Sequence, residues 1–128
     1  MSVQLSSAAR QRIKLLGEFL DRVHRLHGLV EQYATATQNA QLFEMPIRRG
    51  FEQLKLGLTG VGLDAMAQLC GSMVMAMRRG GSPQNRARIL REGVGSLRFQ
   101  LELEQRAVAS DDLSRQQKHA EGAEAQGE

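Results

Sequence analysis

The sequence predicts an all-α protein that folds as an up-down antiparallel four-helix bundle. Apolar residues recur every three or four positions along four segments, and no segment shows the strict alternation of a β-strand. The segments are joined by short connections, which favour antiparallel neighbours. A chain of 128 residues is enough for one domain. Only 4% of the residues are aromatic and none is Trp, so Leu, Met, Ala and Val must fill the core.

The first helix is expected to begin near Ser6 or Ser7, since a serine hydroxyl accepts a hydrogen bond from a free N–H of the first turn. Its apolar residues form one long amphipathic stripe. The stripe consists of Ile13, Leu16, Phe19, Leu20, Val23, Leu26, Val30 and Tyr33. The pattern fades over residues 34–41, which we interpret as a polar connection.

The second helix is expected to begin at Pro46, because proline is favoured at the first helical position. Its inner stripe consists of Ile47, Phe51, Leu54, Leu58 and Val61. Gly50 and Gly57 lie along one edge, where a neighbouring helix could pack closely. Leu56 points almost opposite the stripe, at about 100° per residue.

The third helix is expected to begin at Asp64, whose charge suits the positive end of the helix dipole. A break at residues 60–62 precedes it, and Gly80 and Gly81 end it. Its apolar stripe consists of Leu63, Met66, Leu69, Met73 and Met77.

The fourth helix follows Ser82 and Pro83, which are typical of a cap and a first helical residue. Gly93 and Gly95 indicate close contact with a neighbouring helix. The apolar stripe consists of Leu90, Val94, Leu97, Leu101 and Val108. From about Ser110 the chain is rich in Gln, Ala, Glu and Gly without periodicity. We therefore expect a bundle over residues 1–109 and a disordered tail over residues 110–128.

Composition narrows the class of protein. The chain does not open with a basic and apolar leader, and no apolar run reaches the roughly 18–20 residues of a membrane span, so we expect a cytoplasmic protein without a membrane partner. The single cysteine, Cys70, excludes an intrachain disulfide and fits a reducing compartment. It lies in an apolar helical run, so we expect it to be buried.

The chain carries a formal net charge of +3, concentrated between Arg48 and Arg91. This mild excess favours an acidic partner surface. Nucleic-acid binding through Arg86, Arg88 and Arg91 is an alternative, but aromatic stacking partners are missing, so we expect no nucleic-acid partner.

No catalytic constellation, cofactor motif or metal site is found, so we expect a protein that is not an enzyme. His24 and His27 lie three residues apart on a helix, but two ligands are too few for a metal. Met73 and Met77 have the spacing of core residues, and Met75 lies on another face.

Residues 51–63 resemble the core of a histidine-phosphotransfer (HPt) domain. In that family the segment runs roughly His-x-Leu-Lys-Gly, then small residues, then Val-Gly-Leu. The matching residues here are Leu54, Lys55, Val61, Gly62 and Leu63. Glu52 stands where the family has its phosphorylated histidine, and Leu56 replaces the first glycine. The match of helices and connections extends over about residues 13–106.

The resemblance implies an HPt-like signalling adaptor that has lost the chemistry. A carboxylate at Glu52 cannot form phosphohistidine, whereas Lys55 matches the lysine that neutralises phosphate charge. The implied partner is a response-regulator receiver domain or a histidine kinase, whose phosphorelay the chain would modulate. The implied contact face consists of Arg48, Glu52, Lys55, Leu56 and Thr59.

Two other functions remain open. A helical chaperone or assembly factor would use the Met-rich third helix as an adaptable groove. A true phosphotransfer protein would use His24 or His27, although neither has the Leu-Lys-Gly context. The sequence also leaves a homodimer open.

Overall fold

The structure is a computed structural model that describes residues 4–79 and 81–126, and this part of the chain is helical without strands. No helix in it combines the length and the apolar character needed to cross a bilayer. The elements are α1 (Ser7–Thr35), the short 3-10 helix η1 (Ala40–Phe43), α2 (Glu44–Gly60), α3 (Asp64–Arg78) and α4 (Pro83–Gln126).

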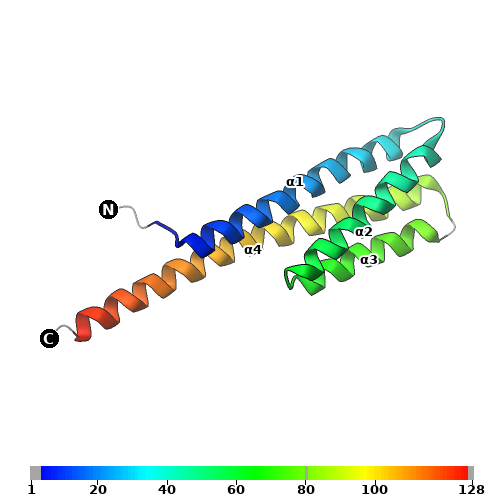
Figure 1. Cartoon of the computed structure of the whole chain (residues 1–128). Helices are drawn as coiled ribbons and strands as arrows, with labels where there is room; N and C mark the ends of the chain where they lie inside the picture. The colour runs from blue at the N-terminus through cyan, green and yellow to red at the C-terminus, as the bar shows by residue number, and fades with distance from the viewer. Residues whose placement is uncertain (1–3, 80, 127–128) are drawn as a thin grey trace.

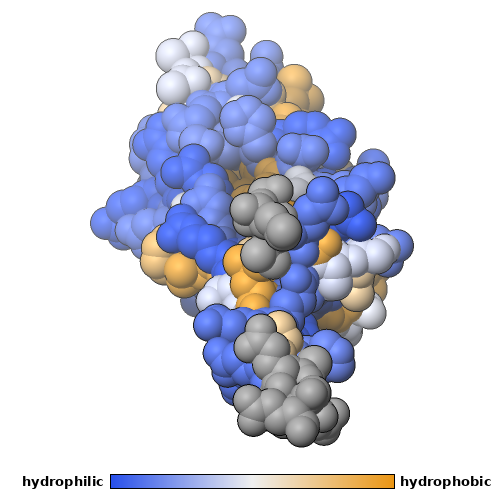
Figure 2. All heavy atoms as spheres, turned by 90° about the vertical axis from the view of Figure 1, so that its left-hand side faces the viewer, coloured by the Kyte–Doolittle hydropathy of each residue, from blue (hydrophilic) through white to orange (hydrophobic). Residues whose placement is uncertain are grey.

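The helices form an all-α bundle in which the chain reverses direction at each connection (Figure 1). α1 packs against α4 and α2, while α3 packs against α2 and α4. α2 and α4 therefore lie diagonally across the bundle. The hairpin of α2 and α3 covers only part of the long α1–α4 pair, and α4 continues beyond the start of α1 (Figure 1). Seen from the end that carries both termini, polar residues dominate the surface and hydrophobic ones form separate patches (Figure 2).

α1 begins as predicted. The Ser6 hydroxyl accepts a hydrogen bond from the Ala9 N–H and caps the first turn. Most of the predicted stripe is buried, whereas Ile13 and Leu20 are partly buried at its edge. The buried members are Leu16, Phe19, Val23, Leu26, Val30 and Tyr33.

α2 begins two residues earlier than predicted, at Glu44 rather than Pro46. η1 leads directly into it, and Pro46 is tolerated because the first four N–H groups of a helix have no partner within the helix. α2 ends at Gly60, and Gly62 takes a φ of 81°, a left-handed conformation that suits glycine. The Leu63 N–H then donates to the Leu58 carbonyl at 2.9 Å, which closes the turn into α3.

α1 and α2 approach closely at two glycines, as predicted. A Cβ on Gly57 would stand 2.8 Å from Cε1 of Phe19, and one on Gly50 would stand 2.8 Å from Cδ1 of Leu26. Larger residues at these positions would push the helices apart.

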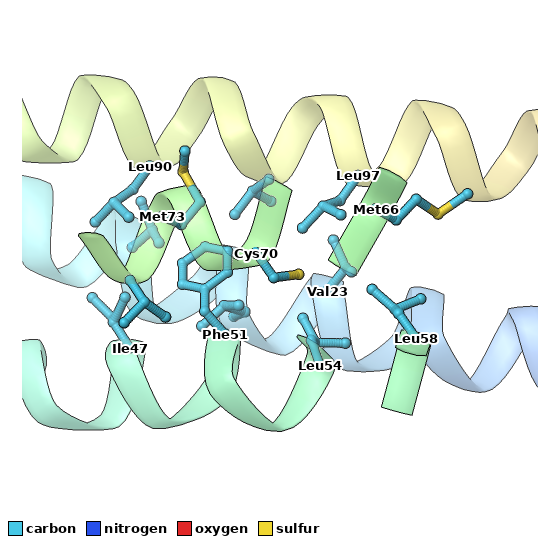
Figure 3. Close-up of a cluster of buried hydrophobic side chains, with 14 of the residues drawn as sticks. Val23, Ile47, Phe51, Leu54, Leu58, Met66, Cys70, Met73, Leu90 and Leu97 are labelled. Atoms are coloured by element: carbon cyan, nitrogen blue, oxygen red, sulfur yellow. The ribbon is translucent and has the colours of Figure 1, made fainter. Parts of the chain in front are cut away.

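α3 begins at Asp64 as predicted, but its buried face is wider than the predicted stripe. Met66, Met73 and Met77 are buried, whereas Leu63 and Leu69 are only partly buried. The buried face is completed by Ala67, Cys70 and Val74. Figure 3 shows side chains of all four helices meeting in one core that includes Val23, Phe51, Cys70 and Leu97. As predicted, Cys70 is buried, and desolvation raises the pKa of its thiol to about 11.

α4 begins at Pro83, where the Ser82 hydroxyl accepts a hydrogen bond from the Asn85 N–H. The predicted stripe is buried except for Val108, which is partly buried. A Cβ on Gly93 would overlap the Met73 side chain, so the predicted close contact exists there. Gly95 has open space around its Cβ position, so packing within this chain does not require a glycine there.

The structure differs from the predicted disordered tail, because α4 continues without a break to Gln126. Ala, Gln and Glu are strong helix formers, which supports a helix without apolar periodicity. Tertiary contacts also hold this segment. The Ser6 N–H and hydroxyl donate to the buried Asp112 carboxylate at 2.8 and 2.6 Å, and the Gln116 amide donates to the Gln4 carbonyl. Residues 127 and 128 of the predicted tail lie outside the described part.

A second polar cluster fastens the opposite end of the bundle. The Arg86 guanidinium pairs with Glu44 at 3.0 Å, and the Tyr33 hydroxyl donates to the same carboxylate at 3.3 Å. Arg86 also donates to the Arg79 carbonyl at the end of α3. Three helices and the last turn of the fourth therefore meet in one network.

The Gly57 contact predicts opposite effects of two Gly→Ala substitutions. Gly57→Ala should destabilise the protein by ~1–3 kcal/mol, because the new methyl group collides with Phe19. Gly28→Ala, in the interior of α1 with open space around it, should stabilise it by about 0.4–1 kcal/mol. Urea unfolding of the two variants measures both changes. Equal effects of the two substitutions would contradict the close approach of α1 and α2.

The Asp112 contact predicts a pH dependence. Hydrogen bonds from the Ser6 hydroxyl and N–H hold the pKa of the Asp112 carboxyl below its ordinary value. A lowered pKa contributes stability that is present above about pH 4 and lost as the pH falls through the folded-state value. We expect Asp112→Asn to lower the melting temperature at pH 7 by a few degrees, with a smaller difference from wild type in acid.

The matched control is Asp111→Asn, because Asp111 is an exposed neighbour. Its melting temperature should follow wild type at every pH. Arg91 lowers the pKa of Glu31, so this ion pair also loses its stabilising effect in acid. All three proteins share that loss, and it cancels in the comparison. A difference between Asp112→Asn and wild type that stays constant into acid would contradict the prediction.

Candidate docking site on helices α2 and α3

The five residues singled out by the sequence lie together on the outward side of α2. None of them is buried. Among the large apolar side chains that the structure describes, Leu56 has the largest exposed fraction, at 75%. Its orientation away from the core agrees with the helical projection, because the buried stripe of α2 occupies the opposite side. A partner that covered this side chain would remove its apolar surface from water, which favours association.

Glu52 lies between two arginines from different helices. Its Oε1 atom is 3.9 Å from Arg48 Nε, one turn earlier on α2, and 3.9 Å from Arg78 Nη2, in the last turn of α3. The Glu52 side chain is 45% exposed, so these pairs are solvated and each contributes at most about 1 kcal/mol. Their effect is mainly to hold the carboxylate in place and to balance its charge.

The Lys55 side chain extends toward α3. Its Nζ is 3.5 Å from the Cβ position of Gly71, so the absence of a side chain at Gly71 leaves room for the lysine. A shallow hollow of about 540 Å³ opens at this point between the two helices. It is lined by Lys55, Gln68, Gly71, Ser72, Met75 and Arg79.

Thr59 contributes less than the other four residues. Its hydroxyl donates to the Lys55 carbonyl at 2.8 Å within α2, so its proton is engaged by the backbone. Only its oxygen lone pairs and its methyl group are available to a partner.

The sequence did not identify the contribution of α3. The predicted contact face included no residue of the third helix, and Met75 was considered only for the chaperone alternative, as part of a Met-rich helix. The structure brings Arg78 to Glu52 and places Met75, which is 50% exposed, at the hollow beside Lys55. Which exposed residues of α3 lie beside the exposed residues of α2 depends on how the two helices pack, and the sequence of either helix alone does not specify it.

The combined face is basic. Arg48, Lys55, Arg78 and Arg79 stand against the single carboxylate of Glu52. No carboxylate of the described residues lies within 4.0 Å of the Lys55 or Arg79 side chain. A basic face that also exposes the apolar side chains of Leu56 and Met75 favours an acidic partner that makes some apolar contact.

The other candidate residues have partners within the bundle. His27 lies 3.4 Å from Glu31, which receives two hydrogen bonds of 2.7 Å from Arg91. Nearby arginines repel a cation, and no group of three His, Cys, Asp or Glu suited to a metal occurs in the described part of the chain. Arg86 is engaged by Glu44 and Arg91 by Glu31, which reduces the charge available to nucleic acid. Three of the methionines of α3 are buried in the core: Met66, Met73 and Met77.

Comparisons of the chain with protein-family models, with curated proteins and with solved structures found no match. From its fold and its surface, the protein is classed as an all-α helical bundle with a basic, partly apolar face on α2 and α3.

Two leucines two residues apart test the assignment of the α2 faces. Leu54 is 2% exposed and Leu56 is 75% exposed. We expect Leu54→Ala to lower the free energy of unfolding by ~2–5 kcal/mol, because it leaves a cavity in the core. Leu56→Ala should change it by less than about 0.5 kcal/mol. Urea denaturation measures both values, and a comparable loss for the two variants would overturn the proposed face.

Proposed function

We propose that this chain is a non-catalytic, HPt-like signalling adaptor that binds a response-regulator receiver domain or a histidine kinase and modulates phosphorelay. The observation that carries the proposal is the exposed Leu56, set among cations one helical turn after Glu52. In the HPt-like motif, Glu52 occupies the position of the phosphorylated histidine.

The chemistry of Glu52 supports binding without phosphotransfer. Phosphorelay requires an imidazole nitrogen that attacks an aspartyl phosphate and holds the phosphoryl group as phosphohistidine. A carboxylate has no such nitrogen, and the charge of Glu52 is balanced by Arg48 and Arg78. The face keeps the positive charge that suits an acidic receiver pocket.

The proposed binding combines an apolar anchor with electrostatic steering. Leu56 and Met75 supply apolar area, while Lys55 and Arg79 attract an acidic surface and increase the rate of encounter. Since exposed charges are screened by salt, the association rate should fall as ionic strength rises. A bound adaptor would compete with active phosphotransfer proteins for the same partner surface.

The test is binding to a panel of purified receiver domains and histidine kinases, measured by titration calorimetry. Leu56→Ala should weaken binding by about tenfold or more, as expected when an interface anchor is truncated. The matched control is Leu42→Ala, because Leu42 is 68% exposed and belongs to η1 rather than to α2 or α3. This variant should bind as wild type does. No binding to any panel member, or equal loss for both variants, would refute the proposed function.

A phosphate label provides a second measurement on the same mixtures. Incubation with phosphorylated receivers and with kinases plus labelled ATP should leave this chain unlabelled, because Glu52 replaces the nucleophile. Acid-labile and base-stable label on the chain would indicate phosphohistidine and contradict the proposal.

A further inference from the structure

We propose that the outward face of α4 joins two copies of this chain as an antiparallel pair. The pairing face consists of Gly95, Phe99, Leu103, Arg106 and Leu113, together with Glu102 and Ala109 at its edge. This inference does not rest on the proposed function, because it uses a different helix and a different set of side chains.

Three large apolar side chains of α4 are exposed on one side of the helix. Phe99 is 59% exposed, Leu103 is 43% exposed and Leu113 is 40% exposed. At about 100° per residue, all three lie within roughly 40° of one direction. The buried Leu90 and Leu97 occupy the opposite side, so no other helix of the chain covers these residues. A shallow hollow of about 520 Å³, lined by Leu113, Gln116, Gln117 and Ala120, extends the apolar surface toward the C-terminus.

Gly95 is the second observation, and it is independent of the first. It lies in the interior of α4, where glycine costs the helix about 1 kcal/mol relative to alanine. Apart from the neighbouring backbone of α4 itself, no atom of the described residues comes within 4 Å of its Cβ position, unlike Gly93, whose Cβ position is occupied by Met73. Gly95 lies one turn before Phe99 and lines a hollow of about 100 Å³ together with His24 and His27 of α1, so its open surface forms the edge of the same face beside α1. A helix that approaches from outside would account for a glycine here.

The face is complementary to itself when two α4 helices run antiparallel with their two-fold axis at Glu104. Leu113 of each copy then lies over the open surface of Gly95 in the other copy. Phe99 lies over Ala109, and the two Leu103 side chains meet near the axis. Large side chains thus oppose small ones along the pair, as close helix packing requires.

The charges agree with the same register. Glu102 of each copy lies beside Arg106 of the other, so the pairing contains two equivalent ion pairs near its centre, each between a carboxylate and a guanidinium. Within one copy, Arg98 reaches Glu102 only at 3.9 Å. This charge complementarity favours a second copy over an unrelated apolar helix as the occupant.

The contact from Gly95 to Leu113 is about 27 Å long, at about 1.5 Å per residue. Such a short two-helix interface lies at the small end of specific interfaces, so we expect a dimer with a Kd on the order of micromolar. α2 lies diagonally across the bundle from α4, so the pair leaves the α2 face of each copy accessible.

The experiment is sedimentation equilibrium of the full chain from about 1 to 500 µM, a range that brackets a micromolar Kd. Wild type should change from monomer to dimer. Gly95→Leu should weaken the dimer at least about tenfold, because the new side chain occupies the space that Leu113 requires. Leucine is the better helix former, so the monomer should be at least as stable, which separates lost pairing from lost folding. Leu42→Ala is the control and should dimerise as wild type does.

A charge exchange tests the register. Glu102→Arg and Arg106→Glu should each weaken the dimer, and the double variant should recover most of the loss, because the two ion pairs re-form with reversed polarity. A chain that stays monomeric throughout would overturn the proposal. A dimer that is unchanged by Gly95→Leu, or single charge variants that the double variant does not rescue, would also overturn it.

Discussion

The close packing of α2 on α1 at Gly50 and Gly57 sets the rotation of α2 about its own axis, and the candidate docking site depends on that rotation. With these glycines against Leu26 and Phe19, the inner stripe of α2 enters the core and Leu56 points to solvent. Lys55 then faces α3, where Gly71 leaves room for it. Three glycines on two helices therefore position the charged and apolar groups of the face.

Ion pairs distribute the positive charge of the protein unevenly. Arg86 and Arg91 are used to connect α4 with Glu44 on α2 and Glu31 on α1. These arginines connect α4 with α2 and α1 near one end of the bundle, and their charge is partly neutralised by the two carboxylates. Among the described residues, Glu52 is the one carboxylate paired with cations of the α2–α3 face, so a modest net charge of +3 produces a distinctly basic surface on one side. The uncovered apolar side chains of α4 lie on the far side of the bundle, away from this charge.

Much of the candidate site was predictable, because it lies on one helix. The 3.6-residue period places Arg48, Glu52, Lys55, Leu56 and Thr59 on the outward side of α2 once the apolar stripe is recognised. The hollow beside Lys55, between α2 and α3, was not predictable in this way. Its far wall comes from α3, and the positions of Met75, Arg78 and Arg79 relative to α2 depend on how the two helices pack. Spacing within one helix carries no information about that.

The sequence by itself determined the helical class, the caps at Ser6 and Ser82, the start of α3 and most core residues, because these follow from local hydrogen bonding and from periodicity along one segment. Tertiary structure decided where order ends. Residues after Ser110 lack an apolar stripe, yet α4 continues there beside the start of α1, with Asp112 bound to Ser6 and Gln116 to Gln4. Tertiary packing also made Gly93 a contact and left Gly95 open. The contacts of Asp112 with Ser6 and of Gly93 with Met73 each join residues more than 15 positions apart in the chain, and no local sequence pattern specifies such contacts.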